Sequence, residues 1–188
     1  MMKDSGKPAA PFPAVLRQYM ELMREVDEAV QALEGLHRDH LRCRPGCSSC
    51  CTLSTVLPLE AAALRLAIAG VDGKVKKLIR APRPGEFCPL LVDCRCAIYQ
   101  SRPLICRTHG LPIAYVDYER QTIDVSVCPL NFTEDYAFAR QELFFIDSFN
   151  VSLAQFNTEY CTQQGLPPAA RIALADIVAV ATAPPPAR

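Results

Sequence analysis

The chain of 188 residues carries 20 lysines plus arginines and 20 aspartates plus glutamates, so its formal net charge is zero. This balance argues against nucleic acid or an anionic membrane surface as the main partner, because both attract a basic protein surface. The length suits one domain with a modest core, and the unusual counts are ten cysteines and no tryptophan.

The chain is expected to begin with a flexible tail over residues 1–13, which contain three prolines. From residue 14 to about residue 40, apolar residues recur at intervals of three and four, which predicts a long amphipathic helix. We expect this helix to pack on the metal-binding region or on a protein partner, and a second copy of the chain would be such a partner. The apolar stripe consists of Val15, Tyr19, Leu22, Val26, Val30, Leu33 and Leu36.

The middle of the chain, residues 43–130, is expected to be an irregular, cysteine-rich core. Pro45 and Gly46, at the start of this core, are expected to end the preceding helix. A second helix is expected inside it, because Pro58 suits a first helical turn and Gly70 suits a helix end.

Shorter elements follow in the same core. A short helix is expected from about residue 72 to residue 79, and a turn at residues 81–85. Residues 113–117 and 122–127 are rich in β-branched and aromatic types, which predicts one small β-hairpin.

The last part of the chain reads as helical. Residues 133–164 predict a helix with a break near Asn150, and residues 169–181 predict a final helix. Residues 184–188 are expected to form a second tail, since three consecutive prolines stand there.

The predicted fold is therefore a single, mostly helical α+β domain over residues 14–183. Its irregular metal-binding centre is flanked by an N-terminal helix at residues 14–40 and by C-terminal helices at residues 133–183.

No apolar run at the N-terminus could serve as a signal sequence. The most apolar late stretch, residues 172–183, contains Asp176 and is too short to cross a bilayer. We therefore expect a cytoplasmic protein with no membrane contact. In that reducing compartment a dense cysteine pattern more often indicates metal than disulfides.

The first cysteine cluster reads Cys43-Arg-Pro-Gly-Cys47-Ser-Ser-Cys50-Cys51. Cys47 and Cys50 form a CxxC pair, whose spacing lets both sulfurs reach one metal; the same spacing also serves redox dithiols. Cys51 follows Cys50 directly, and adjacent side chains seldom ligate one metal. Cys51 therefore serves a second metal or a multinuclear cluster, or it is a small buried apolar residue.

A second set of cysteines lies downstream, and the CxxC pair is expected to share a metal with two of its members. Cys161 stands alone and is expected to be packed in a helix. His109 is a candidate further ligand or a turn residue, and His40 is a candidate ligand or a partner of the helix dipole. The second set comprises Cys88, Cys94, Cys96, Cys106 and Cys128.

Five arginines lie close in sequence to these cysteines. They could donate hydrogen bonds to sulfur and lower thiol pKa values, or they could be surface residues. They are Arg42, Arg44, Arg95, Arg102 and Arg107.

Three stretches carry a resemblance: Cys43-x3-Cys47-x2-Cys50-Cys51, then Cys88-Pro89-Leu90, then Cys96-Ala97-Ile98-Tyr99-x2-Arg102-Pro103-x2-Cys106-Arg107. Together they resemble the YkgJ-type cysteine-cluster family (CxxCxxCC), whose members are described as zinc- or iron-chelating. The resemblance covers roughly residues 43–130; its first gap is one residue longer than in the family, and Cys94 is extra. The metal ligands that it implies are Cys43, Cys47, Cys50, Cys51, Cys88, Cys96, Cys106 and Cys128.

The sequence thus predicts a cytosolic metal-binding protein that chelates zinc or iron and whose metal organises the fold. The alternative is an Fe–S cluster protein with redox or electron-transfer activity, since thiolates also hold such clusters. A third hypothesis is an interaction module whose terminal helices pair with another subunit. No nucleophile elbow, P-loop or dinucleotide fingerprint is present, so the sequence predicts no reaction or catalytic residue.

Overall fold

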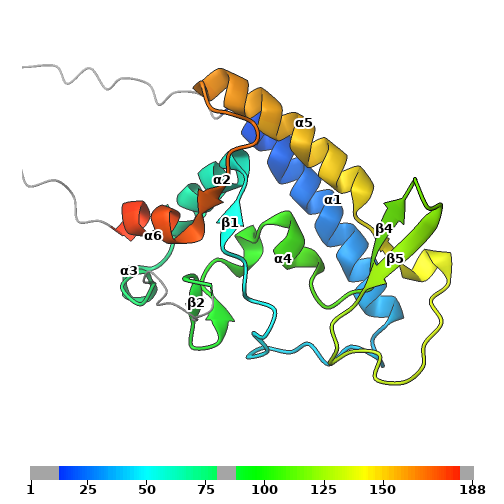
Figure 1. The fold of residues 1–188 in the computed structure, drawn as a ribbon. Helices are drawn as coiled ribbons and strands as arrows, with labels where there is room; N and C mark the ends of the chain where they lie inside the picture. The colour runs from blue at the N-terminus through cyan, green and yellow to red at the C-terminus, as the bar shows by residue number, and fades with distance from the viewer. Residues whose placement is uncertain (1–12, 80–87, 183–188) are drawn as a thin grey trace, which may run out of the picture.

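The computed structural model describes residues 13–79 and 88–182 (Figure 1). Within these ranges the chain forms six α-helices and three small sheets, which confirms the predicted mostly helical α+β class. None of the described helices is long and apolar enough to span a bilayer. The predicted turn at residues 81–85 and almost all of the two predicted tails lie outside the described residues.

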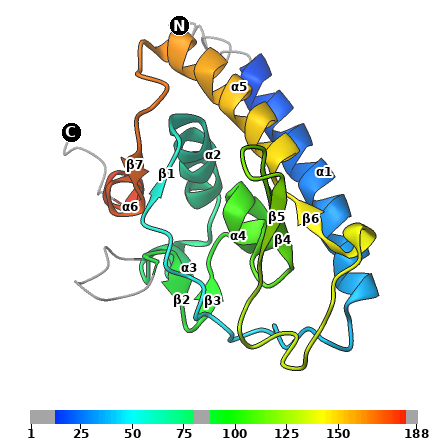
Figure 2. The ribbon, with the colours of Figure 1, turned by 45° about the vertical axis from the view of Figure 1, so that its right-hand side comes forward.

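The N-terminal helix α1 (Ala14–Leu36) follows the predicted stripe, which lies on the buried side except for Leu36. It ends four residues before the predicted boundary, and residues 37–40 form a turn. α1 lies alongside α5 (Asp147–Gln164), as both views of the ribbon show (Figures 1 and 2). Because the chain itself covers the apolar stripe, a partner at α1 would have to use the exposed side of the helix.

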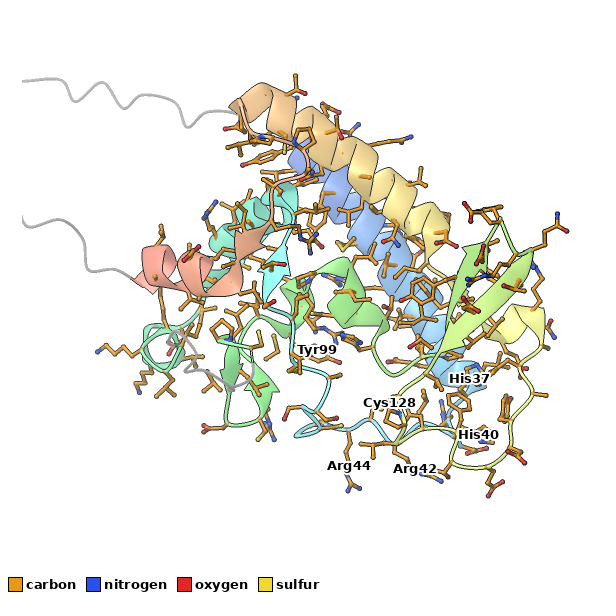
Figure 3. The ribbon with its side chains drawn as sticks, in the orientation of Figure 1. His37, His40, Arg42, Arg44, Tyr99 and Cys128 are labelled. Atoms are coloured by element: carbon orange, nitrogen blue, oxygen red, sulfur yellow. The ribbon has the colours of Figure 1, made fainter. Side chains whose placement is uncertain are left out.

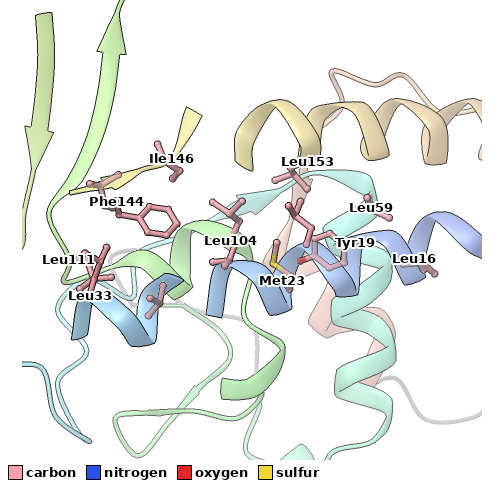
Figure 4. Packing of buried hydrophobic residues seen from close by; sticks show 14 of the residues in the cluster. Leu16, Tyr19, Met23, Leu33, Leu59, Leu104, Leu111, Phe144, Ile146 and Leu153 are labelled. Carbon is pink, nitrogen blue, oxygen red and sulfur yellow. The ribbon is translucent and has the colours of Figure 1, made fainter. Parts of the chain in front are cut away.

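The larger of two apolar cores lies between α1, α5, α2 (Pro58–Ala69) and α4 (Leu104–Thr108) (Figure 4). α2 begins and ends where the sequence predicts, since Pro58 occupies its first position and Gly70 caps its C-terminus. Buried residues of this core include Tyr19, Met23, Leu59, Leu104, Leu111, Phe144, Ile146 and Leu153.

A smaller core forms between α2 and α6 (Leu174–Thr182). Strands β1 (Thr55–Val56) and β7 (Ile172–Ala173) pair antiparallel beside it. β7 occupies residues predicted to be helical, so α6 starts later than the sequence suggests. The short helix α3 (Gly73–Lys76) falls within the predicted range, and the Asp72 side chain caps it by accepting from Lys74 N.

The predicted hairpin is confirmed as β4 (Ile113–Asp117) and β5 (Thr122–Ser126), with Ile113 opposite Ser126 and Asp117 opposite Thr122. A second hairpin, β2 (Leu91–Val92) with β3 (Arg95–Cys96), was not predicted. A strand of two residues is too short to show the alternation of apolar and polar residues by which a strand is predicted from sequence.

The prediction for residues 133–146 was wrong, because this stretch contains no α-helix. It holds the 3-10 turn η2 (Arg140–Glu142) and strand β6 (Phe144–Phe145), which pairs parallel with β4. Pairing with β4 buries Phe144 in the larger core, and a helix at this point would forgo that contact. α5 then runs through Asn150 without the predicted break.

Arg107 fastens the cysteine region to α1. Its side chain is only 5% exposed and forms an ion pair with Asp27 of α1. The same guanidinium donates to the backbone carbonyls of Arg102, at 2.7 Å, and of Gln100, at 2.8 Å. Arg107 therefore holds α4 and the 3-10 turn η1 (Tyr99–Ser101) against α1.

Arg107→Met should lower the free energy of unfolding by about 3 kcal/mol, because two carbonyls and a carboxylate lose a buried donor. Chemical denaturation of the reduced protein measures the change. Arg24→Met is the control, because Arg24 pairs with Glu21 and Glu28 at an exposed site on α1. This substitution should leave stability almost unchanged. Equal losses for both variants would contradict the role given to Arg107.

Candidate metal centre

All ten cysteines lie in the part of the chain that the structure describes, and all ten are free thiols. Cys161 is fully buried in α5, away from the others, which confirms its prediction as a packed helix cysteine. Cys94 is exposed at the tip of the β2–β3 hairpin, where it and Asp93 have positive φ angles. The remaining eight thiols come from four segments of the chain.

The first cysteine segment, residues 41–54, has no helix or strand. Two tight turns shape it instead. Cys47 N donates to Arg44 O at 2.9 Å across Pro45 and Gly46, and Gly46 has a φ of 97° that glycine adopts readily. Cys51 N then donates to Ser48 O at 2.9 Å. These turns fold four cysteines into a short stretch of backbone.

Asn131 ties this segment to the chain around Cys128. The side chain of Asn131 is buried; its Oδ1 accepts from Arg42 N at 2.7 Å, and its Nδ2 donates to Gly110 O at 2.7 Å. Nδ2 also lies 3.6 Å from Cys43 Sγ, within hydrogen-bonding distance of a sulfur, while Asn131 N donates to Cys128 O at 2.9 Å. Figure 3 shows Cys128 beside the segment that carries Arg42 and Arg44.

The outer group is the set Cys43, Cys47, Cys50 and Cys128. Partial burial raises the pKa of the Cys43 thiol, the Asn131 amide opposes this rise, and the charges of the other three thiols add to it. Burial also raises the pKa of Cys50, with contributions from Cys51, Cys47 and Cys128. The outer group is thus defined as Cys43 and the thiols whose charges act on it.

A second set of thiols gathers around Cys51. Cys88 N donates to Cys51 O at 2.8 Å, which fixes the two backbones side by side. The β2–β3 hairpin then returns the chain so that Cys96 stands opposite Leu91. Cys106 follows on α4, which Pro103 precedes as its N-cap residue.

The inner group is the set Cys51, Cys88, Cys96 and Cys106. Burial raises the pKa of Cys88 to about 11 and that of Cys106 to about 12, and charges of other thiols in the group add to both shifts. Burial raises the pKa values of Cys51 and Cys96 as well. Without metal, these thiols are therefore protonated at neutral pH.

Residues 42–129 match the CxxCxxCC family model, which is described as a putative zinc- or iron-chelating domain. We call this matched stretch, residues 42–129, the CxxCxxCC domain. The matched range starts one residue before Cys43 and ends one residue after Cys128, so the CxxCxxCC domain contains both thiol groups and excludes Cys161. Neither the curated proteins nor the solved structures that were compared with the chain gave a match.

Arg102 is the arginine of the CxxCxxCC domain that acts on the thiols. Its positive charge opposes the rise in the pKa values of Cys51, Cys96 and Cys106. Its guanidinium lies 3.7 Å from the centre of the Tyr99 ring, and Nη1 donates to Cys106 O at 3.0 Å. These contacts hold the cation beside the inner group.

The histidines lie outside both thiol groups. His40 stacks on Phe132 with ring centres 5.5 Å apart, in an aromatic cluster with His37 and Tyr136. Its ring is therefore engaged by aromatic residues, and the structure gives no support to His40 as a ligand. His109 caps the end of α4, and burial followed by the charge of Arg102 lowers its pKa.

The donors of the CxxCxxCC domain fit a thiophilic metal in kind and number. The domain offers eight free thiols, and Asn131 and Arg102 supply the polar and positive groups that thiolates need. As the side chains stand, however, no three His, Cys, Asp or Glu residues of the described chain are arranged to hold a metal. A metal would have to draw the thiols of a group together.

The expected pairing, in which Cys47 and Cys50 share a metal with two cysteines of the second set, stays a prediction. Cys128 of that set is among the thiols whose charges raise the pKa of Cys50. Asn131 and Gly110 were missed altogether. Their types carry no chemical signal in one sequence, and their importance comes from contacts across long stretches of chain.

Gly110→Ala should weaken metal binding and lower stability by about 2 kcal/mol, because a side chain is strained at a φ of 101°. A Cβ at this position would also lie 2.9 Å from Cys43 Sγ. Gly35→Ala is the control, because Gly35 lies in α1 with nothing within 4 Å of the added carbon. Zinc titration and thermal unfolding would measure both effects; unchanged zinc affinity in Gly110→Ala would show that the Cys43 contact is unimportant.

The metal-free protein should lose stability as pH rises from about 9 toward 12. Because the folded pKa values of Cys88 and Cys106 lie above the unfolded value, the folded state holds these protons more tightly, and this stabilisation disappears as they dissociate. Denaturation under anaerobic, reducing conditions across this range measures the slope. The Cys88→Ala/Cys106→Ala variant should show a shallower slope, and an identical slope would contradict the assignment.

Proposed function

We propose that this chain is a metal-binding protein in which the eight cysteines of the outer and inner groups bind zinc or iron. The observation that carries the proposal is that eight free thiols, from four separate segments, all lie inside the CxxCxxCC domain. Dense thiols without disulfides are typical of metal binding in a reducing compartment. They also support a cytoplasmic location.

The metal would organise the fold of residues 43–128. The segment at residues 41–54 is irregular, and its turns alone contribute little stability. Thiol protons leave when a metal binds, so the binding free energy adds directly to the folding free energy. Each bound ion would displace the thiol protons and hold the resulting thiolates together by their attraction to a shared cation.

Three residues near the thiols would stabilise the thiolates or position them in this proposal. Asn131 Nδ2 donates to the sulfur of Cys43 and disperses its charge. Arg102 stabilises the inner group electrostatically, while Arg107 fixes the backbone that carries Cys106. A site whose four positions are all taken by cysteine is closed, which supports a structural rather than a catalytic role.

A second candidate is an Fe–S protein with redox or electron-transfer activity. The observation that favours it is a donor set made of thiols alone, with His37 and His40 held in an aromatic cluster. Such a cluster takes cysteine thiolates as its usual protein ligands. Iron and sulfide in the purified protein would select this candidate over zinc.

Elemental analysis of anaerobically purified protein tests the proposal. We expect a stoichiometric metal in the unaltered chain and a reduced content in Cys47→Ser, because serine is a poor ligand for a thiophilic metal. Cys94→Ser is the control, since Cys94 is exposed at a hairpin tip and belongs to neither group. The absence of both zinc and iron from the unaltered chain would contradict the proposal. An unchanged metal content in Cys47→Ser would contradict the ligand assignment.

A further inference from the structure

Strand β5 forms an open edge of the three-stranded sheet. The strand order is β5-β4-β6, so β4 lies on one side of β5 and no strand of the described chain lies on the other. All residues of β5, Thr122–Ser126, are exposed. Native edge strands are commonly protected from pairing by lysine, proline or a bulge. β5 pairs continuously with β4, contains neither lysine nor proline, and has Asp124 as its one charged residue.

The backbone groups that point outward from β5 follow from the bonds on the far side of β4. Ile146 N donates to Ala114 O at 3.3 Å, and Val116 N donates to Asp147 Oδ2 at 2.8 Å. Ala114 and Val116 therefore turn their backbone groups to the β6 side of β4. Because successive residues of a strand direct their N–H and C=O groups to opposite sides, Tyr115 turns its groups toward β5.

Two residues of β5 have their backbone groups directed away from the sheet. Tyr115 stands opposite Asp124, so the backbone of Asp124 bonds to β4. Its neighbours Ile123 and Val125 therefore direct their N–H and C=O groups outward. Within residues 13–79 and 88–182, these outward groups form no hydrogen bond. β5 thus presents two residues whose backbone is free to pair with a further strand.

The side chains beside this edge form an apolar row on one face of the sheet. Val125 stands opposite Ala114, and Ala114 stands opposite Phe145, so these three side chains lie on the same face. Ile123 stands opposite Val116 on that face. Ile123 and Val125 are each 40% exposed. A strand added at the edge would extend this row and cover both side chains if its own residues there were apolar.

Asp124 lies on the opposite face of the sheet, because its side chain alternates with those of Ile123 and Val125 along the strand. On the same face, Asp117 Oδ2 lies 3.5 Å from Arg120 Nη1. Asp124, by contrast, is paired with no cation of the described chain. A basic residue placed directly opposite Asp124 on an added strand would therefore be favoured.

We propose that β5 binds an extended segment of a partner protein, which adds to the sheet as an antiparallel strand and carries a basic residue between two apolar, β-branched residues. The two apolar residues stand opposite Val125 and Ile123 and exchange backbone hydrogen bonds with them. The basic residue stands opposite Asp124. This inference is independent of bound metal, because the edge contains none of the candidate metal ligands.

A second copy of the chain fits this edge less well than such a partner. An antiparallel pairing of β5 with itself that uses all the outward groups sets Ile123 opposite Val125 of the other copy. Asp124 then stands directly opposite Asp124 of the other copy, and like charges in that position destabilise a pair of strands. A basic residue replaces this repulsion with an attraction.

Amide NMR spectra of the full chain, titrated with the acetylated peptide Ser-Thr-Val-Lys-Val-Thr-Ser, test the proposal. The peptide should shift the amide signals of Ile123 and Val125 and slow their exchange with solvent. The Asp124 amide, which is bonded to β4, should be the more protected one before the peptide is added. A peptide with glutamate in place of lysine should bind more weakly by about fivefold or more.

Methylated peptides distinguish backbone pairing from nonspecific apolar contact. In the proposed strand the backbone N–H groups of the two valines point at β5, whereas that of the lysine points away. Methylating the backbone nitrogen of either valine should weaken binding by about tenfold or more. Methylating the backbone nitrogen of the lysine is the matched control and should change binding little. Equal losses for both kinds of peptide would overturn the pairing.

Two variants of Val125 carry the same test to the protein. Val125→Pro removes the outward N–H without removing a bond to β4, and it should abolish binding of the lysine peptide. Val125→Thr keeps the N–H and the β-branched shape and should retain binding within about threefold. Thermal unfolding checks that both variants fold. If Val125→Pro does not, the methylated peptides on the unaltered chain decide the question.

Three further results would overturn the proposal. Unchanged amide signals of Ile123 and Val125 at the highest soluble peptide concentration would show that this edge does not pair. Equal binding of the lysine and glutamate peptides would exclude recognition of a basic residue by Asp124. Protection of the same amides that rises with protein concentration, without peptide, would assign the edge to a second copy of the chain.

Discussion

Irregular backbone around the cysteines has to satisfy its hydrogen bonds without the help of a helix or a sheet, and the arrangement of the domain depends on how this is achieved. Buried polar side chains provide much of the answer. Asn131 bonds Arg42 N and Gly110 O, and Arg107 bonds the carbonyls of Gln100 and Arg102. Asn131 reaches back to Arg42, and Arg107 also forms an ion pair with the distant Asp27, so each fixes a cysteine segment against a distant part of the chain.

Glu60 plays a corresponding part within the helical framework. Its buried carboxylate accepts from Leu57 N at 3.1 Å and from Leu104 N at 3.4 Å, at the N-termini of α2 and α4. Burial raises the pKa of Glu60, and the two backbone donors oppose that rise. One side chain thereby sets the position of α4, and with it Cys106, relative to the larger core.

Helices with a strong local signal could be predicted from the sequence. α1 shows an apolar period of three to four residues, and α2 is delimited by Pro58 and Gly70. Residues 133–146 could not be predicted, because Phe144 and Phe145 pair with β4 and this partner lies about thirty residues earlier in the chain. The hairpin of β4 and β5 was predictable because both strands and their turn are local.

The spacing of the cysteines predicted the kind of donor but not which segments of the chain come together. A CxxC pair identifies two sulfurs that can approach one ion, and it says nothing about which later segments return to that point. Here Asn131 brings Cys128 to the first cluster, while the β2–β3 hairpin brings Cys96 toward Cys88. These are tertiary contacts, and no local pattern encodes them.

The two apolar cores depend differently on the thiols. The larger core, built from α1, α5, α2 and α4, is completed by carbon side chains and includes none of the eight candidate ligands. The smaller core has Cys88 and Cys96 packed directly against it. A metal bound by Cys88 and Cys96 would therefore stabilise the smaller core and with it α6, whereas the packing of α1 against α5 involves none of these thiols. This asymmetry gives the domain a helical side with carbon packing and an irregular, cysteine-rich side.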